Sequence, residues 1–186
     1  MNITLVRHGK PTASCNPTVK ASGFANWVRA YNHSYIAEDS QPTKPLQDKL
    51  TGHFIFASNL NRARHSAQLC IGKQPDMVLP ELRELDIPRL KIPLKMKVNH
   101  WLAISRILWL FGISGNSESI TRGRARIRKA VDSLEQQVTQ TPNIAVFGHG
   151  LANRFIAKEL VKRGWQVKQK GSGFWSSIEL TKPVPS

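Results

Sequence analysis

Short apolar runs rich in β-branched and aromatic residues recur along the chain and predict strands that are buried in a sheet. These runs cover residues 2–6, 53–57, 77–79, 144–147 and 174–180. Two of them, 2–6 and 144–147, are followed after one further residue by a histidine and a glycine, so the pattern also marks two places where a histidine stands at the end of a strand.

Longer stretches with helical spacing separate the strands. Residues 61–71 and 151–163 predict helices, and Gly164 is a plausible stop for the second. In the stretch 117–138, one helical face is apolar, formed by Ile127, Val131, Leu134 and Val138. Strands that alternate with helices predict an α/β fold, a three-layer α/β/α sandwich around a mostly parallel sheet.

Two segments fall outside this alternation, at about 10–50 and 86–112. The first is rich in Pro, Ser, Thr and Asn and contains a predicted helix at 23–36. The second ends in a very apolar predicted helix, 101–111, whose residues Trp101, Ile104 and Leu108 share one face and are expected in the core. We expect both segments to form walls or a small lid over a site within a single domain spanning 1–186.

The net charge of +15 is the one extreme bulk property, and it predicts attraction to anions. A dense basic run lies at 122–129, for which a solvated helix face is the simpler interpretation and an anionic partner the alternative. No apolar run is long enough to span a membrane, and no signal peptide precedes the first strand, so we expect a cytoplasmic protein without a membrane partner. Cys15 and Cys70 suggest neither a disulfide framework nor a metal site.

Three predicted strand ends carry the candidate chemistry. His8 and His149 each follow a strand, and Arg62 falls in the first turn of the helix after a third strand. In open α/β sheets, ligands bind beyond the carboxyl ends of the strands. Guanidinium and imidazole donors gathered there suit a phosphoryl group, whose charge is spread over several oxygens.

On these residues the chain resembles the histidine phosphatase superfamily, in its phosphoglycerate mutase-like branch 1. The motifs occur in the family's order: Arg7-His8-Gly9, Ser58-x-Leu60-x-Arg62-Ala63, Leu82-x-Glu84, Gly115-x-Ser117-Glu118-Ser119 and Gly148-His149-Gly150. The chain departs from the family where a Thr and an Asn often follow the first motif, because Pro11 and Ser14 stand there.

The resemblance implies a catalytic role for three side chains. His8 would be a neutral nucleophile that carries a transient phosphohistidine. Glu84 would protonate the leaving oxygen and then activate water, with Glu81 and Asp86 as alternatives. His149 would be a second donor to the phosphoryl oxygens, most useful when protonated.

The phosphoryl oxygens would be bound by basic side chains and a backbone amide. These phosphate-binding residues would be Arg7, Arg62, His149 and the amide of Gly150. No cofactor is implied. The remaining histidines lack paired ligand spacing, so we predict no metal and expect them on the surface or in packing: His33, His53, His65 and His100.

The favoured function is a phosphomonoesterase acting through His8 on a phosphorylated metabolite or a phosphoprotein. Hydrolysis is favoured because mutases of this family are longer and carry insertions that this chain lacks. Two alternatives stay open: a phosphoglycerate-type mutase, and a catalytically degenerate module that binds an anionic partner. Nucleic acid is a possible but not favoured partner, and the sequence leaves the oligomeric state open.

Overall fold

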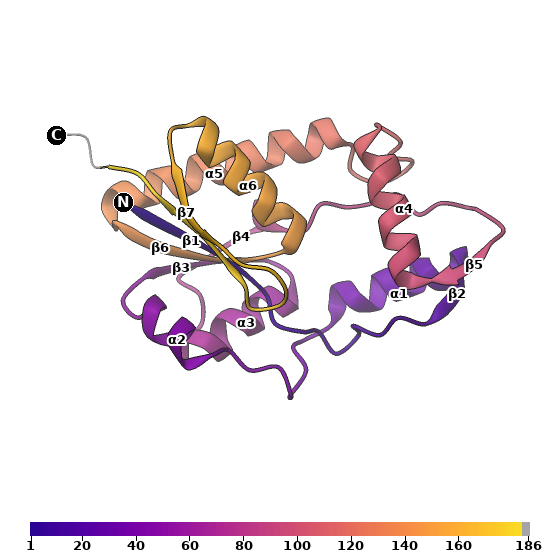
Figure 1. The fold of residues 1–186 in the computed structure, drawn as a ribbon, viewed down its shortest axis with the longest axis horizontal. Helices are drawn as coiled ribbons and strands as arrows, with labels where there is room; N and C mark the ends of the chain where they lie inside the picture. The colour runs from indigo at the N-terminus through magenta and orange to yellow at the C-terminus, as the bar shows by residue number, and fades with distance from the viewer. Residues whose placement is uncertain (184–186) are drawn as a thin grey trace.

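The computed structural model describes residues 1–183 and contains a six-stranded sheet that lies between two layers of helices (Figure 1). The strand order is β4-β3-β6-β1-β8-β7. The first four strands in this order are mutually parallel, and β8 runs antiparallel to both of its neighbours, β1 and β7. Their bounds are β4 Met77–Leu79, β3 Phe54–Ser58, β6 Asn143–Gly148, β1 Asn2–Arg7, β8 Ser177–Thr181 and β7 Gln166–Lys170. The prediction of a mostly parallel sheet is confirmed.

Helices cover both faces of the sheet, because the central strands are apolar on both sides. In β6, Ile144 and Val146 pack on the side of α5 and α6, whereas Ala145 and Phe147 pack on the side of α2 and α3. Alternate residues of a strand point to opposite faces, so a continuous apolar run belongs between two layers. The helices are α2 Lys44–Leu50, α3 Asn61–Ile71, α5 Ile120–Gln140 and α6 Gly150–Lys162.

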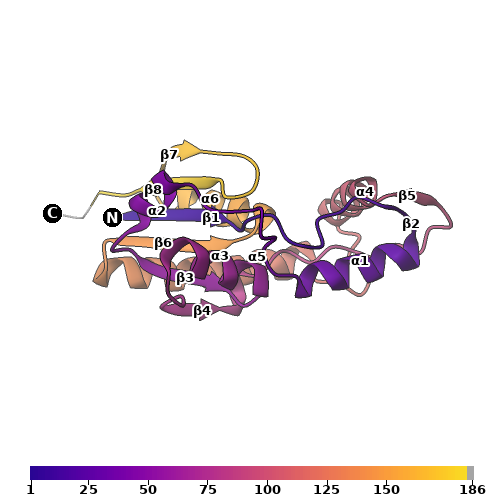
Figure 2. The same ribbon diagram turned by 90° about the horizontal axis from the view of Figure 1, so that it is seen from below.

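The remaining elements lie together at one end of the molecule, beyond the sheet (Figures 1 and 2). They are β2 Thr18–Lys20, α1 Ala21–His33, β5 Lys95–Lys97 and α4 Val98–Leu110. This lid has a small apolar core in which Phe24 stacks on Trp101 at 5.6 Å between ring centroids. The indole of Trp101 also donates a hydrogen bond to the carbonyl of Val19. The two irregular segments, 10–50 and 86–112, therefore meet in one structure.

Several elements were not predicted. Strand β7 is fully exposed and polar, and β2 and β5 are three residues each, so none carries an alternating apolar pattern. Helix α2 and a short 3₁₀ helix, η1 Pro80–Leu82, were also missed. The prediction for α4 was wrong about the buried face: Trp101 is buried, but Ile104 and Leu108 are only half-buried. Its other buried side chains are Val98, Ser105 and Trp109.

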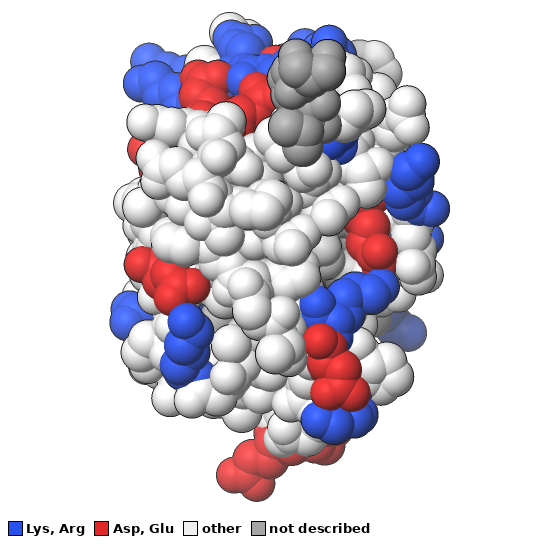
Figure 3. Space-filling model, turned by 90° about the vertical axis from the view of Figure 1, so that its left-hand side faces the viewer, with Lys and Arg blue, Asp and Glu red and all other residues white. Residues whose placement is uncertain are grey.

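The end of the molecule that lies away from the lid shows no large field of one charge (Figure 3). Lys and Arg side chains there stand beside Asp and Glu side chains around a largely uncharged centre. Among residues 1–183, no helix is long and apolar enough to cross a membrane.

Candidate active site

Strand register brings the three predicted strand ends together. In the sheet β6 lies between β1 and β3, with Arg7 paired to Gly148 and Ala57 paired to Phe147. Residues that follow these positions therefore emerge side by side at the carboxyl edge of the parallel strands. The rings of His8 and His149 lie 5.2 Å apart between centroids, at an interplanar angle of 60°.

The hydrogen bonds of His8 assign its tautomer. Nδ1 lies 2.7 Å from the carbonyl oxygen of Gly9, which can only accept, so Nδ1 carries the proton. Nε2 lies 3.3 Å from Nε of Arg62, which can only donate, so Nε2 presents its lone pair. The arrangement leaves Nε2 as a potential nucleophile.

The surroundings of His8 favour its neutral form. The side chain is 2 % exposed. Burial lowers the pKa of His8 to about 3, and the charges of Arg62 and Arg7 lower it further. The hydrogen bond to the carbonyl of Gly9 raises the pKa but does not offset these effects. His8 is therefore uncharged at neutral pH, as a nucleophilic imidazole must be.

His149 is also neutral in this structure, whereas the resemblance implies a donor to phosphoryl oxygens that is most useful when protonated. Complete burial holds its pKa well below the usual range, and the charge of Arg62 adds to the effect. Its Nε2 lies 2.9 Å from the hydroxyl of Ser58, whereas its Nδ1 is buried without a hydrogen-bond partner among the described residues.

Arg62 is buried in the site and bound by residues of α1. It is 1 % exposed, and its Nη1 donates to the carbonyl of Tyr31 at 3.0 Å and to Oδ1 of Asn32 at 3.5 Å. Its guanidinium also lies 4.7 Å from the centroid of the Tyr31 ring. A buried guanidinium that keeps donors directed toward His8 is suited to binding phosphoryl oxygens.

Arg7 approaches the same place from β1. Its guanidinium lies 4.4 Å from the centroid of the Phe174 ring, and its Nε is buried without a partner among residues 1–183. Arg7 packs against Gly150, where a Cβ would lie in ordinary contact with Arg7 Nε at 3.4 Å. With Nδ1 of His149, the site therefore contains two buried polar atoms that lack a partner.

The glycine after the nucleophile candidate is required by packing rather than by backbone conformation. Gly9 does not have a positive φ. A Cβ at this position would lie 2.5 Å from the indole ring of Trp175, too close for any side chain. Trp175 itself adopts φ 58° in the β7–β8 loop, which also carries Phe174 to the site.

Glu84 lies in the cavity wall and binds the start of α6. Its Oε1 accepts hydrogen bonds from the amides of Leu85 at 3.1 Å and Ala152 at 2.9 Å, and Oε2 accepts from Leu151 at 3.3 Å. The amides of Leu151 and Ala152, which follow Gly150 at the start of α6, therefore bind the Glu84 carboxylate in this structure.

The two alternative acids lie differently. Asp86 also lines the cavity, where its Oδ1 accepts from the amide of Ile87 and lies 4.0 Å from Arg89. Glu81 is half-buried and does not line the cavity. The geometry therefore favours Glu84 and leaves Asp86 as the remaining alternative.

Arg126 positions the Glu84 loop. Its guanidinium pairs with Glu118 at 2.7 Å and donates to the carbonyls of Glu81, Arg83 and Glu84. Sequence reasoning placed Arg126 in a solvated run, and the other basic residues of that run are indeed exposed: Arg122, Arg124, Arg128 and Lys129. Glu118, from the motif at residues 115–119, therefore binds Arg126, and Arg126 in turn holds the loop that carries Glu84.

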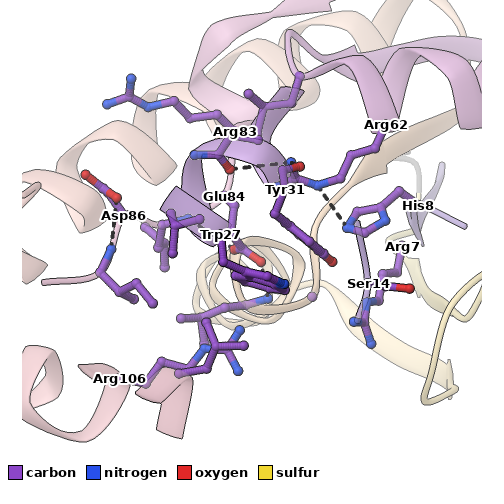
Figure 4. A pocket seen from close by; sticks show the side chains of 18 of the residues that line it. Arg7, His8, Ser14, Trp27, Tyr31, Arg62, Arg83, Glu84, Asp86 and Arg106 are labelled. Carbon is purple, nitrogen blue, oxygen red and sulfur yellow. Dashed lines mark hydrogen bonds between the residues drawn. The ribbon is translucent and has the colours of Figure 1, made fainter. Parts of the chain in front are cut away.

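A cavity of about 640 Å³ extends from His8 toward the lid. Trp27 and Tyr31 of α1 line its middle and Arg106 of α4 lies on the far side (Figure 4). Sequence reasoning missed these residues, since the i, i+4 spacing of two aromatic side chains usually indicates core packing. Ser14, which replaces a family Asn, also lines the cavity.

The described residues contain no cluster of side chains suited to holding a metal ion. Within residues 1–183, no three side chains of His, Cys, Asp or Glu gather as metal ligands would. His65 has a structural contact, because it accepts a hydrogen bond from the amide of Ile36. His33 and His100 are exposed, and His53 is half-buried. Cys15 is exposed, Cys70 is buried, and both are free thiols.

The fold and the site together define a class, and the sequence comparison names it. Residues 42–180 match the family model of the Histidine phosphatase superfamily (branch 1), so the chain belongs to this family. The matched segment contains Arg62, Glu84, His149 and Gly150, whereas Arg7 and His8 precede it. No curated protein matches the chain.

Solved structures share the fold at low sequence identity. The phosphoglycerate mutase of Bacillus anthracis str. Sterne has a TM-score of 0.64 and 18% identity, covering 98% of this chain and 88% of its own. The protein TTHB049 of Thermus thermophilus has a TM-score of 0.56 and 21% identity, covering 96% and 92%. A putative alpha-ribazole-5'-P phosphatase of Escherichia coli has a TM-score of 0.55 and 18% identity, covering 87% and 79%.

Proposed function

We propose that the protein is a phosphomonoesterase that works through a phosphohistidine on His8. The observation that carries the proposal is the state of His8: a buried, neutral imidazole whose Nε2 lone pair faces a guanidinium. Family membership supports phosphoryl chemistry in general, and the geometry of His8 supports a nucleophilic role.

In the first step, Nε2 of His8 attacks phosphorus and the bond between phosphorus and the leaving oxygen breaks. Protonated Glu84 gives its proton to that oxygen, and an alcohol departs. The hydrogen bond from Nδ1 to the carbonyl of Gly9 stabilises the positive charge that the ring gains. In the second step, water gives a proton to the Glu84 carboxylate and attacks phosphorus. The N–P bond breaks, its electron pair returns to Nε2, and phosphate leaves.

The cage around the phosphoryl group comes from donors that are unused or poorly used in this structure. Arg7 Nε and His149 Nδ1 have no partner among the described residues, and Arg62 Nε is engaged only by His8 at 3.3 Å. When an anion binds, Arg62 can turn this donor toward a phosphoryl oxygen and release the Nε2 lone pair. A dianion beside His149 also favours protonation of its ring, so the charged donor state belongs to the complex.

Water rather than a second hydroxyl is the proposed acceptor. The cavity is bordered by exposed side chains such as Arg83, Arg89 and Asn99, so solvent reaches the position where the leaving group departs. The substrate is a phosphorylated metabolite or a phosphoprotein in this proposal, and no cofactor or metal takes part in the steps above.

Rapid mixing with a phosphomonoester, followed by denaturation in base, tests the proposal. Acid-labile, base-stable phosphate should appear on the protein within one turnover, and His8→Ala should remove it and lower kcat by at least about a thousandfold. The exposed His33→Ala serves as the matched control. Unchanged turnover in His8→Ala would overturn the proposal.

Product analysis separates hydrolysis from transfer. Release of inorganic phosphate from a phosphoglycerate supports the hydrolase, whereas movement of phosphate between its hydroxyls would show a mutase. Salt-sensitive binding of an anionic polymer that survives His8→Ala, without any turnover, would instead point to the degenerate binding module.

A further inference from the structure

The cavity is larger than one phosphoryl group needs, and its wall is basic well beyond His8. Its 640 Å³ falls within the range of about 300–1,000 Å³ that is typical of sites for whole small molecules. Only two carboxylates of the described residues line it, those of Glu84 and Asp86. Beyond the pair at the strand ends, four arginines line it: Arg83, Arg89, Arg106 and Arg154.

Two of these four arginines are already paired. The guanidinium of Arg83 lies 3.7 Å from Glu118, and that of Arg89 lies 4.0 Å from Asp86. Among residues 1–183, neither Arg106 nor Arg154 has a carboxylate within 4.0 Å. The cavity thus retains positive charge that the protein does not neutralise.

Arg106 lies apart from the phosphoryl cage. In Figure 4 it stands across Trp27 and Tyr31 from His8, on the lid helix α4. Its charge still reaches the cavity: burial raises the pKa of Tyr31, and the guanidinium groups of Arg62 and Arg106 oppose that rise. The two ends of the cavity therefore present positive charge with aromatic surface between them.

The aromatic surface is rigid. The rings of Trp27 and Tyr31 stack at 4.8 Å between centroids with an interplanar angle of 24°. The indole of Trp27 donates to the carbonyl of Cys15 at 3.1 Å, which fixes its orientation. A preorganised flat surface suits the carbon skeleton of a ligand, since little side-chain entropy is lost on contact.

We propose that the leaving group of the substrate carries a second anionic group, a phosphate or a carboxylate, which Arg106 binds while Trp27 and Tyr31 contact the skeleton between the two charges. The proposal rests on the proposed function only in placing the scissile phosphoryl group beside His8. It narrows the substrate class to phosphomonoesters with two separated anionic groups.

Phosphonates test this subsite, because they bind without being hydrolysed. Calorimetry would compare alkylphosphonates of graded length with two matched series, one ending in a carboxylate and one in a second phosphonate. We expect the doubly anionic ligands to bind more tightly at one favoured length. The better of the two series identifies the second anion.

The variants are Arg106→Gln, Arg106→Lys and Arg124→Gln. Arg124 is an exposed arginine of α5 outside the cavity, so its loss matches the change in net charge. Arg106→Gln should weaken doubly anionic ligands roughly ten- to hundredfold more than singly anionic ones, and Arg106→Lys should restore part of the difference. Arg124→Gln should affect both classes alike.

The outcomes separate this proposal from the proposed function. Equal weakening of both ligand classes by Arg106→Gln, or no preference of the unmodified protein for doubly anionic ligands, would overturn the subsite. If no phosphohistidine forms but the ligand preference is intact, the esterase proposal fails and the subsite stands as part of an anion-binding cavity.

Discussion

The Nε–H of Arg62 donates a hydrogen bond to Nε2 of His8 over 3.3 Å. A guanidinium has no lone pair to offer, so this contact requires an unprotonated nitrogen on the imidazole. Arg62 thereby selects the tautomer of His8 and protects its lone pair until an anion competes for the donor, and its charge adds to the burial that lowers the pKa of His8.

Removal of the Glu84 carboxylate should slow hydrolysis in a way that depends on the leaving group. Glu84→Gln should lower kcat about a hundred- to a thousandfold for an alkyl phosphate, whose alkoxide needs a proton, and much less for an aryl phosphate with an acidic phenol. Steady-state kinetics with the two substrates check this. Asp86→Asn and Glu81→Gln are the matched controls, and a larger leaving-group effect in Asp86→Asn would move the acid to Asp86.

Acid should destabilise the fold partly through His8. The pKa of His8 is about 3 in the fold against an ordinary value of 6.5, so below pH 6.5 the unfolded chain takes up a proton that the folded chain refuses. The contribution of neutral His8 to the free energy of unfolding is therefore fully present above pH 6.5 and is lost as the pH falls toward 3. Between pH 6.5 and 5 the free energy of unfolding falls by about 1.5 kcal/mol through this group.

Urea unfolding across this pH range measures the effect. His8→Gln should flatten the pH dependence of the unfolding free energy by that amount. An unchanged pH dependence in His8→Gln would show that His8 is not the buried neutral group described here.

Ser58 should control the tautomer of His149. The hydroxyl of Ser58 accepts from the amide of Leu60 at 3.3 Å and keeps its own proton for Nε2 of His149, which leaves the other proton on Nδ1. We expect Ser58→Ala to mix the two tautomers and weaken vanadate binding by about tenfold.

Nitrogen NMR of labelled histidines reports the tautomer directly, and a purely structural role of Ser58 would not change it. Ser105→Ala, at a buried serine of the lid without a described partner, is the control for loss of a buried hydroxyl. A His149 spectrum identical in Ser58→Ala and the unmodified protein would contradict the assignment.

The pair of Arg126 and Glu118 should support both stability and catalysis. The two side chains are 12% and 9% exposed, and Arg126 also binds carbonyls of the Glu84 loop. Arg126→Gln leaves the buried Glu118 carboxylate with only the longer contact to Arg83, so we expect a loss of about 2 to 3 kcal/mol of unfolding free energy together with a lower kcat. Denaturant unfolding and kinetics check both, and Arg128→Gln, exposed on the same helix, should change neither.

The sequence alone predicted the layers of the fold and the residues that meet at the site. Apolar runs buried on both faces, such as 144–147, and amphipathic helices determine a sandwich, because each element has only one way to bury its apolar surface. Arg7, His8, Arg62 and His149 were predicted from their positions at strand ends, since parallel strands deliver their carboxyl ends to one edge.

The tertiary structure decided what those residues are surrounded by. The neutral state of His149, the use of the α6 amides by Glu84, and the role of Arg126 all depend on burial and on contacts between residues far apart in the chain. The position of Arg106 in the cavity wall also depends on tertiary contacts. It belongs to the lid, whose apolar helical spacing in the sequence is the same as that of an ordinary core helix. Local periodicity records which face of an element is apolar, but protonation and partner choice follow from three-dimensional proximity, which no local pattern encodes.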